Sequence, residues 1–314
     1  MLRSVCVCKL PARIHYTPSR LFSSGTRPAS YNVKNLAVIG GGQMGLGIAL
    51  VAASVADLNV TVIDNSQASL HKGISFIDKL LSRDVAKGRL TEERLAEVKG
   101  MIKLTTNFET ISESDFIIEA VPEIVSLKLE IFNRLAQEAP AHAILSTNTS
   151  SISITKIAAS ALGAENRVIS THFMNPVPVQ RGVEIITGLQ TSQETLDTAM
   201  TLVESMGKIP SISSDSPGFL ANRILIPYIN EAIICLETGI GSKEDIDSIM
   251  KNGCAMPMGP LALADFIGLD TCLAIMNVLY ANTADSKYRP SVLLSKMVDA
   301  GWLGKKSGKG FYEY

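Results

Sequence analysis

Short apolar runs alternate with amphipathic stretches over the first two thirds of the chain. The run at residues 36–39 has no polar alternation, which suits a central parallel strand covered on both faces. Similar strand-like runs lie at residues 60–63, 102–105, 116–123, 143–145, 168–171, 183–187 and 209–213. Helical patterns lie between them, at residues 44–56, 66–83, 126–139, 152–161 and 192–206, with another opening at Thr91. This order predicts an α/β fold with an open, doubly wound, mostly parallel sheet and helices on both faces.

The pattern changes near residues 214–218. Beyond it, helical periodicity covers residues 219–238, 242–251, 261–280 and 291–300, and convincing strands are absent. We therefore predict a sheet domain over residues 31–214 and an all-helical domain over residues 215–314. The helical domain is small and apolar, so we expect it to form a homodimer. We also expect it to take part in substrate binding.

A glycine turn follows the first apolar run and opens the first helix. Gly40 would permit the tight turn, Gly42 would let backbone N–H groups approach a pyrophosphate, and Gly45 would let the helix pack closely. Gln43 and Met44 stand at the start of that helix, where unsatisfied N–H groups and the positive dipole end favour phosphate. This arrangement predicts a Rossmann-like dinucleotide-binding unit.

Asp64 ends the second strand, 19 positions after the last glycine of the turn. Its carboxylate would accept hydrogen bonds from the adenosine ribose hydroxyls and repel a 2′-phosphate, so we predict NAD rather than NADP. A βαβ unit whose glycines serve only close packing explains the turn but leaves Asp64 unexplained.

His172 closes an apolar strand just before a proline-rich loop, at the edge of the sheet where a substrate would meet the cofactor. Imidazole has a pKa suited to accepting a hydroxyl proton while hydride leaves the same carbon. If the strand containing Glu184 returns beside the first, its carboxylate would hold the far ring nitrogen. Alone, either residue could be structural, His172 at a strand end and Glu184 as a solvated acid.

Composition and residue spacing argue against several other classes of protein and of site. The chain has 314 residues, 46% hydrophobic and 19% charged, which suits about two domains with a substantial core. No apolar run reaches the roughly 18 residues of a membrane span, so none is predicted. The five cysteines are scattered and indicate reduced thiols, and no His, Cys or carboxylate cluster has metal-ligand spacing.

Residues 1–30 contain five basic residues and no acidic one. Arginine and serine without acids are typical of an import presequence, which predicts a segment that is disordered or removed and a mitochondrial matrix location rather than a plastid. A basic disordered arm is the alternative reading. Without those five charges, the net charge of −1 becomes −6, which argues against nucleic-acid binding.

Several segments resemble the NAD-dependent L-3-hydroxyacyl-CoA dehydrogenases, in family order after the presumed presequence. They are Gly40-Gly41-Gly42-Gln43-Met44-Gly45, Glu119-Ala120-Val121-Pro122-Glu123, Ser146 to Ser151, His172-Phe173-Met174-Asn175-Pro176, Asp215 to Arg223, Met256-Pro257-Met258-Gly259-Pro260 and Gly304 to Tyr312. The compact helical part and the Gly301-Trp302-Leu303-Gly304 ending look most like the short-chain, 3-hydroxybutyryl-CoA type.

The resemblance implies reversible oxidation of a 3-hydroxyacyl-CoA, in fatty acid β-oxidation or short-chain acyl-CoA metabolism. It makes His172 the base and Glu184 its partner, with Asn222 and Ser150 bonding the 3-oxygen. It places further residues around the cofactor, namely Glu123, Lys128, Asn175 and Lys306, with Ala120 through its backbone. Individually, Asn222 could cap a helix, Ser150 could close an ST-turn, and Lys306 could be a solvated tail charge.

Two other functions remain open from the sequence. One is a related NAD-dependent dehydrogenase acting on a free hydroxy acid or a sugar acid. The other is an inactive NAD-binding structural protein, as among crystallin-like relatives. For the enzyme, we expect the substrate to lie in a cleft between the two domains.

Overall fold

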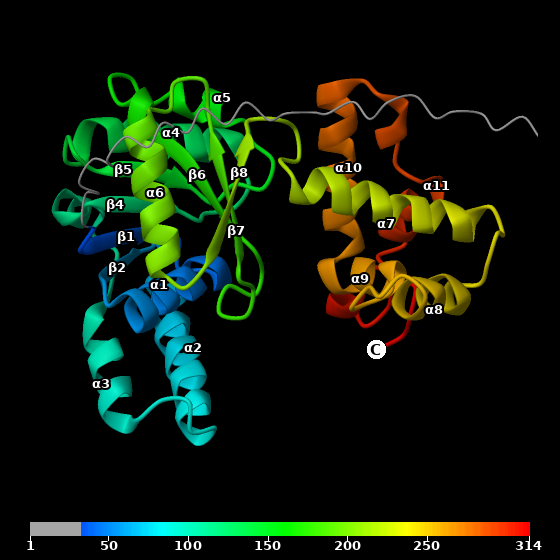
Figure 1. Cartoon of the computed structure of the whole chain (residues 1–314), viewed down its shortest axis with the longest axis horizontal. Helices are drawn as coiled ribbons and strands as arrows, with labels where there is room; N and C mark the ends of the chain where they lie inside the picture. Colours follow the sequence, from blue (N-terminus) through cyan, green and yellow to red (C-terminus); the bar gives the residue numbers. More distant parts are fainter. Residues whose placement is uncertain (1–32) are drawn as a thin grey trace, which may run out of the picture. The chain divides into compact units, whose positions relative to one another are not determined.

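The computed structural model describes residues 33–314, and an eight-stranded sheet forms its N-terminal part (Figure 1). The strands are β1 (Asn35–Ile39), β2 (Asn59–Ile63), β3 (Ile102–Thr105), β4 (Phe116–Glu119), β5 (Ile144–Thr147), β6 (Val168–Phe173), β7 (Gly182–Thr187) and β8 (Ile209–Ser214). Their order is β3-β2-β1-β4-β5-β6-β7-β8. Strands β1 to β6 are parallel, β7 is antiparallel to β6, and β8 is parallel to β7. The predicted mostly parallel sheet is confirmed.

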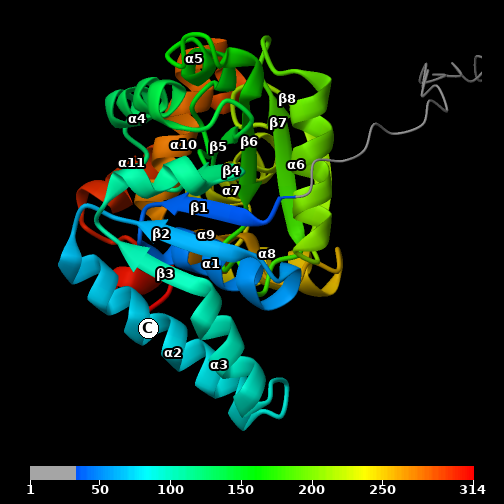
Figure 2. The ribbon, with the colours of Figure 1, turned by 90° about the vertical axis from the view of Figure 1, so that its left-hand side faces the viewer.

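Helices connect most of the strands, and helices make up most of the chain after β8. The helices of the sheet part are α1 (Gln43–Ala56), α2 (Gln67–Ala86), α3 (Glu92–Met101), α4 (Val125–Glu138), α5 (Ile154–Ala158) and α6 (Gln193–Ser205), with short 3-10 helices at Phe108–Glu113 and Glu165–Arg167. Helices α2 and α3 extend together beyond the β3 edge of the sheet (Figure 2). The predicted start at Thr91 is confirmed, because the Thr91 hydroxyl accepts a hydrogen bond from Arg94 N at 3.2 Å.

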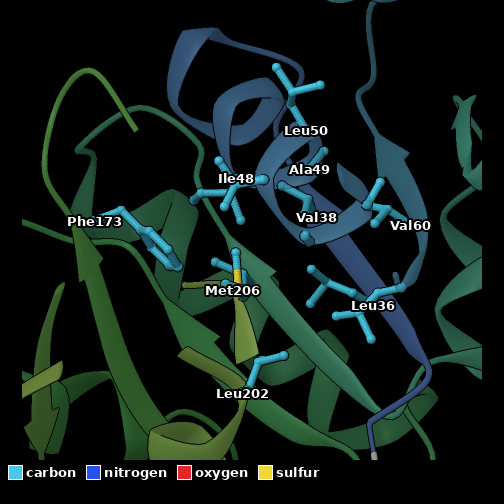
Figure 3. Packing of buried hydrophobic residues seen from close by; sticks show 14 of the residues in the cluster. Leu36, Val38, Ile48, Ala49, Leu50, Val60, Phe173, Leu202 and Met206 are labelled. Atoms are coloured by element: carbon cyan, nitrogen blue, oxygen red, sulfur yellow. The ribbon is translucent and has the colours of Figure 1, made fainter. Parts of the chain in front are cut away.

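Apolar layers cover both faces of the sheet, because residues of each buried strand alternate between the faces. On one face, Leu36 and Val38 of β1 belong to a cluster with Ile48 of α1 and Leu202 of α6 (Figure 3). On the other face, Ala37 belongs to a cluster completed by side chains of α4 and α5. The sheet is therefore a buried central layer, and its accessible parts are the loops at the strand ends.

The remaining chain forms a helical part with its own core. Its helices are α7 (Ala221–Glu237), α8 (Lys243–Asn252), α9 (Pro260–Ile267), α10 (Leu269–Thr283) and α11 (Val292–Asp299), with 3-10 turns at Ser286–Tyr288 and Lys305–Ser307. Apolar side chains of α7, α9, α10 and α11 form one cluster. The predicted all-helical C-terminal part is confirmed.

One predicted helix is wrong. Residues 261–280 do not form a single helix, because Gly268 has φ +104° and separates α9 from α10, whose axes differ by 96°. Glycine adopts this conformation at low cost and so ends a helix that the apolar periodicity continues across. Within residues 33–314, no single helix is long and apolar enough to cross a membrane, and α9 and α10 reach that length only as this bent pair. The predicted import segment lies outside the described residues.

Candidate active site

The glycine turn after β1 contains two positions that exclude a side chain. Gly40 has φ +114°, and a Cβ there would lie 2.7 Å from the carbonyl oxygen of Ala120. A Cβ on Gly45 would lie 2.0 Å from the carbonyl oxygen of Gly40, far inside van der Waals contact. Only glycine therefore lets β1, the turn and α1 pack this closely, as the spacing predicted.

Gly42 differs from its neighbours, because no atom lies within 4 Å of the place where its Cβ would be. It is the N-cap residue of α1, and no side chain caps that helix end. The first N–H groups of α1, including those of Gln43 and Met44, therefore keep their hydrogen-bonding capacity for a ligand. An open, uncapped helix N-terminus of this kind fits the pyrophosphate of a dinucleotide.

Asp64 lies directly after β2 and beside the turn. Its Oδ2 accepts a hydrogen bond from Gly41 N at 2.7 Å, and its Oδ1 accepts one from Ser66 N at 2.8 Å. Each carboxylate oxygen has a second lone pair, so Asp64 can still accept hydrogen bonds from ribose hydroxyls. The carboxylate is thus held in place by backbone donors at the position where a ribose would lie.

The loops beyond β1, β4, β5 and β6 are linked to one another. Ala120 N donates to Ile39 O at 2.7 Å, and Asn148 N donates to Glu119 O at 2.7 Å. Asn148 Oδ1 in turn accepts from Phe173 N at 2.8 Å. Because these strands are parallel, their carboxyl ends lie on one edge of the sheet, which is the edge where open α/β sheets bind ligands.

His172 and Glu184 face each other across an antiparallel strand pair. They are register partners in β6 and β7, and His172 Nδ1 lies 2.9 Å from Glu184 Oε2. Their side chains are 10% and 7% exposed, so water competes little with this contact. The predicted return of the second strand is confirmed, and the carboxylate of Glu184 contacts Nδ1 of His172.

Glu184 also contacts the start of α7. Its Oε1 accepts hydrogen bonds from Leu220 N at 2.8 Å and from Ala221 N at 2.9 Å. Burial acts to raise the pKa of Glu184, but the hydrogen bonds from His172, Ala221 and Leu220 outweigh it and lower the pKa below its ordinary value. Glu184 is therefore an ionised acceptor at neutral pH, and the positive end of the α7 dipole stabilises it.

Lys128 and Glu119 form a buried ion pair next to the loop after β4. Lys128 of α4 and Glu119 of β4 have side chains that are 1% and 0% exposed, and Lys128 Nζ lies 2.6 Å from Glu119 Oε1. The same oxygen accepts from Val121 N at 2.7 Å, and Glu119 Oε2 accepts from Thr147 Oγ1 at 2.7 Å. Lys128 is also 3.4 Å from Glu123 Oε2. The pair therefore joins the ends of β4 and β5.

Glu123 organises the polar loop after β5. Its Oε1 accepts from Thr149 Oγ1 at 2.5 Å, from Ser150 N at 2.9 Å and from Ser151 N at 3.0 Å. Burial acts to raise the pKa of Glu123, but the charge of Lys128 and these donors outweigh it and lower the pKa. The ionised carboxylate therefore fixes the backbone around Ser150, whose hydroxyl also donates to it at 3.2 Å.

Asn222 reaches the same loop from the first turn of α7. Its Nδ2 donates to the backbone oxygen of Ser150 at 3.2 Å, and it does not cap the helix. The ST-turn in the loop is closed by Thr149, whose Oγ1 accepts from Ile152 N at 3.0 Å. Asn222 therefore forms no helix cap and Ser150 closes no ST-turn, and the side chain of Asn222 contacts the backbone of Ser150.

Two family models match the chain. The model described as 3-hydroxyacyl-CoA dehydrogenase, NAD binding domain, matches residues 35–216, and the one described as 3-hydroxyacyl-CoA dehydrogenase, C-terminal domain, matches residues 218–314. The chain belongs to the 3-hydroxyacyl-CoA dehydrogenase family.

Individual members of the family are similar over nearly their whole length. A probable 3-hydroxybutyryl-CoA dehydrogenase of Bacillus subtilis is 50% identical over 90% of this chain and 98% of its own. Human mitochondrial hydroxyacyl-coenzyme A dehydrogenase is 40% identical over 93% of this chain and 96% of its own. The crystal structure of (S)-3-hydroxybutyryl-CoA dehydrogenase from Ralstonia eutropha has a TM-score of 0.87 and 45% identity, over 90% of this chain and 99% of its own.

The cofactor of this dehydrogenase family member is NAD, and the turn fits it. The open Gly42 position, the uncapped α1 and the carboxylate of Asp64 supply what a pyrophosphate and a ribose without a 2′-phosphate require. Gln43 Nε2 also donates to Asn175 Oδ1 at 3.3 Å, which links the turn to the loop after His172. Within residues 33–314, no group of His, Cys, Asp and Glu side chains could hold a metal ion.

Lys306 lies in the helical part, whereas the other predicted cofactor residues lie in the sheet part. Its Nζ lies 2.6 Å from Asp270 Oδ1, next to Gly268 at the break between α9 and α10. Its side chain is 48% exposed, so it is not buried in the cluster of Glu123 and Lys128. Because it forms an ion pair with Asp270, it is also not an isolated charge in a solvated tail. Its role toward NAD stays a prediction.

Three residues that organise the site lie in the segments that carry the family resemblance, but none of them was given a role of its own from the sequence. Glu119 forms the buried pair with Lys128. Asp215 Oδ2 accepts hydrogen bonds from Ser153 Oγ at 2.7 Å and Thr155 N at 2.8 Å, which ties the end of β8 to α5. Phe219 packs against His172. An acid that ends an otherwise apolar strand was a usable signal for Glu119, whereas Phe219 resembles any core residue.

The two glycines of the turn should respond differently to alanine. Gly45→Ala should lower the free energy of unfolding by about 1–3 kcal/mol, because the new methyl group overlaps a backbone oxygen. Gly42→Ala should leave stability unchanged but weaken NADH binding roughly tenfold, because the methyl group keeps the pyrophosphate from one N–H donor. Urea unfolding and NADH fluorescence titration measure the two effects.

The matched control for this pair is Gly100→Ala. No atom lies within 4 Å of a Cβ at Gly100, which is in α3, far along the chain from the turn. NADH binding should therefore stay near wild type, and the free energy of unfolding should stay equal or rise by up to about 1 kcal/mol, because alanine is favoured over glycine in a helix. Normal NADH binding by Gly42→Ala would contradict the assignment of the α1 N-terminus to the pyrophosphate.

Proposed function

We propose that this chain oxidises (S)-3-hydroxyacyl-CoA to 3-ketoacyl-CoA with NAD, using His172 as the general base and Glu184 as the residue that orients it. The observation that carries the proposal is the buried hydrogen bond of 2.9 Å between His172 Nδ1 and Glu184 Oε2, at the carboxyl edge of a dinucleotide-binding sheet. Membership of the 3-hydroxyacyl-CoA dehydrogenase family supports the substrate class.

The ionisation of Glu184 decides which nitrogen of His172 carries the hydrogen atom. An ionised carboxylate can only accept, so Nδ1 of the neutral imidazole carries the hydrogen and Nε2 keeps its lone pair. Nε2 then accepts the proton of the substrate 3-hydroxyl group. The imidazolium that forms is stabilised by Glu184, which keeps its own charge throughout.

The oxygen left on the substrate needs hydrogen-bond donors while the C3–H bond breaks. Asn222 uses one N–H on the Ser150 carbonyl group, so its other N–H can donate to that oxygen. The Ser150 hydroxyl donates to Glu123 and would turn toward substrate. Together they would stabilise alkoxide-like charge. NAD, when bound, would supply the acceptor for the hydride of C3, so that the substrate would lose one proton to His172 and one hydride to the cofactor.

The proposed reaction is tested in the reducing direction by following NADH loss. Acetoacetyl-CoA should be reduced at least about a hundredfold more efficiently than free acetoacetate, because the family's substrates are CoA thioesters. Reduction of the free acid at an equal rate would favour a hydroxy-acid or sugar-acid dehydrogenase instead. No oxidation of 3-hydroxybutyryl-CoA with excess NAD would favour an inactive structural protein.

We also propose the short-chain type of substrate. The supporting observation is that relatives 46–50% identical are named 3-hydroxybutyryl-CoA dehydrogenases. The reaction would then serve β-oxidation or short-chain acyl-CoA metabolism. A series of 3-ketoacyl-CoA substrates of increasing length should give its highest kcat/KM at four carbons, and a maximum at ten or more would contradict the short-chain type.

For location, we propose the mitochondrial matrix. The five basic residues and absence of acids in residues 1–30 support this, as does the similarity to a relative named as mitochondrial. A fusion of residues 1–30 to a fluorescent protein should enter mitochondria in living cells, and a diffuse cytosolic signal would contradict the proposal.

For assembly, we propose a homodimer formed through the helical part. Large apolar side chains are exposed there, and they include Ile224, Ile249, Phe266, Val292 and Trp302. Exposed apolar surface of this kind is typical of subunit interfaces. Light scattering coupled to size exclusion should give twice the mass of one chain, and a monomeric mass would contradict the proposal.

A further inference from the structure

Phe219 has a backbone conformation that a phenylalanine rarely adopts. Its φ is +50°, directly after Gly218 with φ +77° and directly before the N-cap residue of α7. Within residues 33–314, only three other non-glycine residues have positive φ, at Asp57, Ala255 and Ala284. Left-handed backbone is unfavourable for a side chain of this size and persists only where the surroundings enforce it.

The turn at Phe219 directly precedes the first N–H groups of α7. Immediately after it, Leu220 N and Ala221 N both donate to Glu184 Oε1, at 2.8 and 2.9 Å. Helix α7 has no side-chain cap near its own start, so these two donors would otherwise be unsatisfied. The carboxylate that contacts the base is therefore also held by the residues just after the turn.

The ring of Phe219 contacts the base itself. It is 2% exposed, belongs to the apolar cluster on the α4 side of the sheet, and meets the His172 ring edge-on with centroids 6.0 Å apart and planes at 62°. His172 thus has two fixed neighbours, the carboxylate at Nδ1 and the aromatic ring. These leave the imidazole little freedom to rotate.

We propose that Phe219 is a positioning residue for the reaction, because its ring holds the imidazole of His172 while its left-handed turn aims the α7 N–H groups at Glu184. This inference rests on the proposed function, in which His172 is the base. A residue needed only for core packing would not require the unfavourable backbone conformation. Phe219 itself touches neither proton nor hydride.

The test compares two buried phenylalanines of the same apolar cluster. Phe132 of α4 is fully buried and belongs to the same cluster as Phe219. Phe219→Leu should lower kcat for acetoacetyl-CoA reduction by roughly 10–100-fold, because a misplaced base reacts slowly even when substrate binds. KM for acetoacetyl-CoA and NADH should stay within about threefold. Phe132→Leu should leave kcat within about twofold of wild type.

Further variants separate this inference from the proposed function and from misfolding. Phe219→Tyr keeps the ring and should keep kcat within about threefold of wild type. If Phe219→Leu does not fold, Phe219→Met is measured in its place with the same expectations. Normal kcat in the Leu or Met variant, or an equal loss in Phe132→Leu, overturns the positioning role. Normal kcat in His172→Gln overturns the proposed base instead.

Discussion

Replacing His172 with glutamine is expected to lower kcat by about 10²–10⁴-fold while NADH binding is retained. The glutamine amide can still donate a hydrogen bond to Glu184, but no atom of it accepts a proton at neutral pH. Because the side chain lies on β6 and not in the glycine turn, the cofactor should bind as before. Steady-state reduction of acetoacetyl-CoA and a fluorescence titration with NADH measure the two quantities.

His71→Gln is the matched control. His71 is an exposed residue of α2 whose ring lies 3.4 Å from the amide nitrogen of Gln67. Its replacement should leave kcat within about twofold of wild type. If His172→Gln turns over nearly as fast as wild type, His172 is not the base, whatever its contact with Glu184.

Replacing Lys128 with methionine is expected to lower the free energy of unfolding by about 3–5 kcal/mol. The change removes the ammonium group that lies 2.6 Å from Glu119 and leaves a fully buried carboxylate without a counterion. The loop after β4 should loosen as well, because Lys128 also donates to Val121 O. Urea unfolding followed by circular dichroism measures the loss.

Two further variants show whether the buried charge is the cause. The double variant Glu119→Gln with Lys128→Met should be more stable than Lys128→Met alone, because no isolated charge stays buried. Arg134→Met breaks the ion pair with Glu138, whose partners are 48% and 36% exposed, and should cost less than about 1 kcal/mol. Equal losses of unfolding free energy in Lys128→Met and Arg134→Met would show that the buried ion pair contributes no more to stability than an exposed one.

The contrast between Glu119 and Glu184 shows how far the sequence predicted the site. Glu184 was paired with His172 on the condition that its strand returned beside the first, and the antiparallel register of β6 and β7 meets that condition. No comparable pattern predicted the partner of Glu119, because Lys128 lies on a helix after an irregular loop. Strand register can be inferred from spacing, whereas the orientation of a helix on a sheet cannot.

Prediction from the sequence was also incomplete in the helical part. Apolar periodicity predicted its helices well but ran across Gly268, where φ of +104° ends α9. A glycine inside an apolar pattern is compatible both with a continuous helix and with a break, and packing of the following helix decides between them.

By itself, the sequence determined the features that depend on near neighbours along the chain. The apolar runs specified the strands, the spacing of Gly40, Gly42 and Gly45 specified the turn, and Thr91 specified a helix start. Each depends on backbone geometry within a few residues, which local residue types control.

Only the tertiary structure decided which distant groups meet. It placed the α7 N–H groups on Glu184, Asn222 on the Ser150 carbonyl group and the Phe219 ring on His172. These contacts join segments 36 to 72 residues apart, and the register of the sheet and the path of the chain into α7 bring them together. No local preference carries that information, because burial and hydrogen bonding are satisfied jointly by the whole fold.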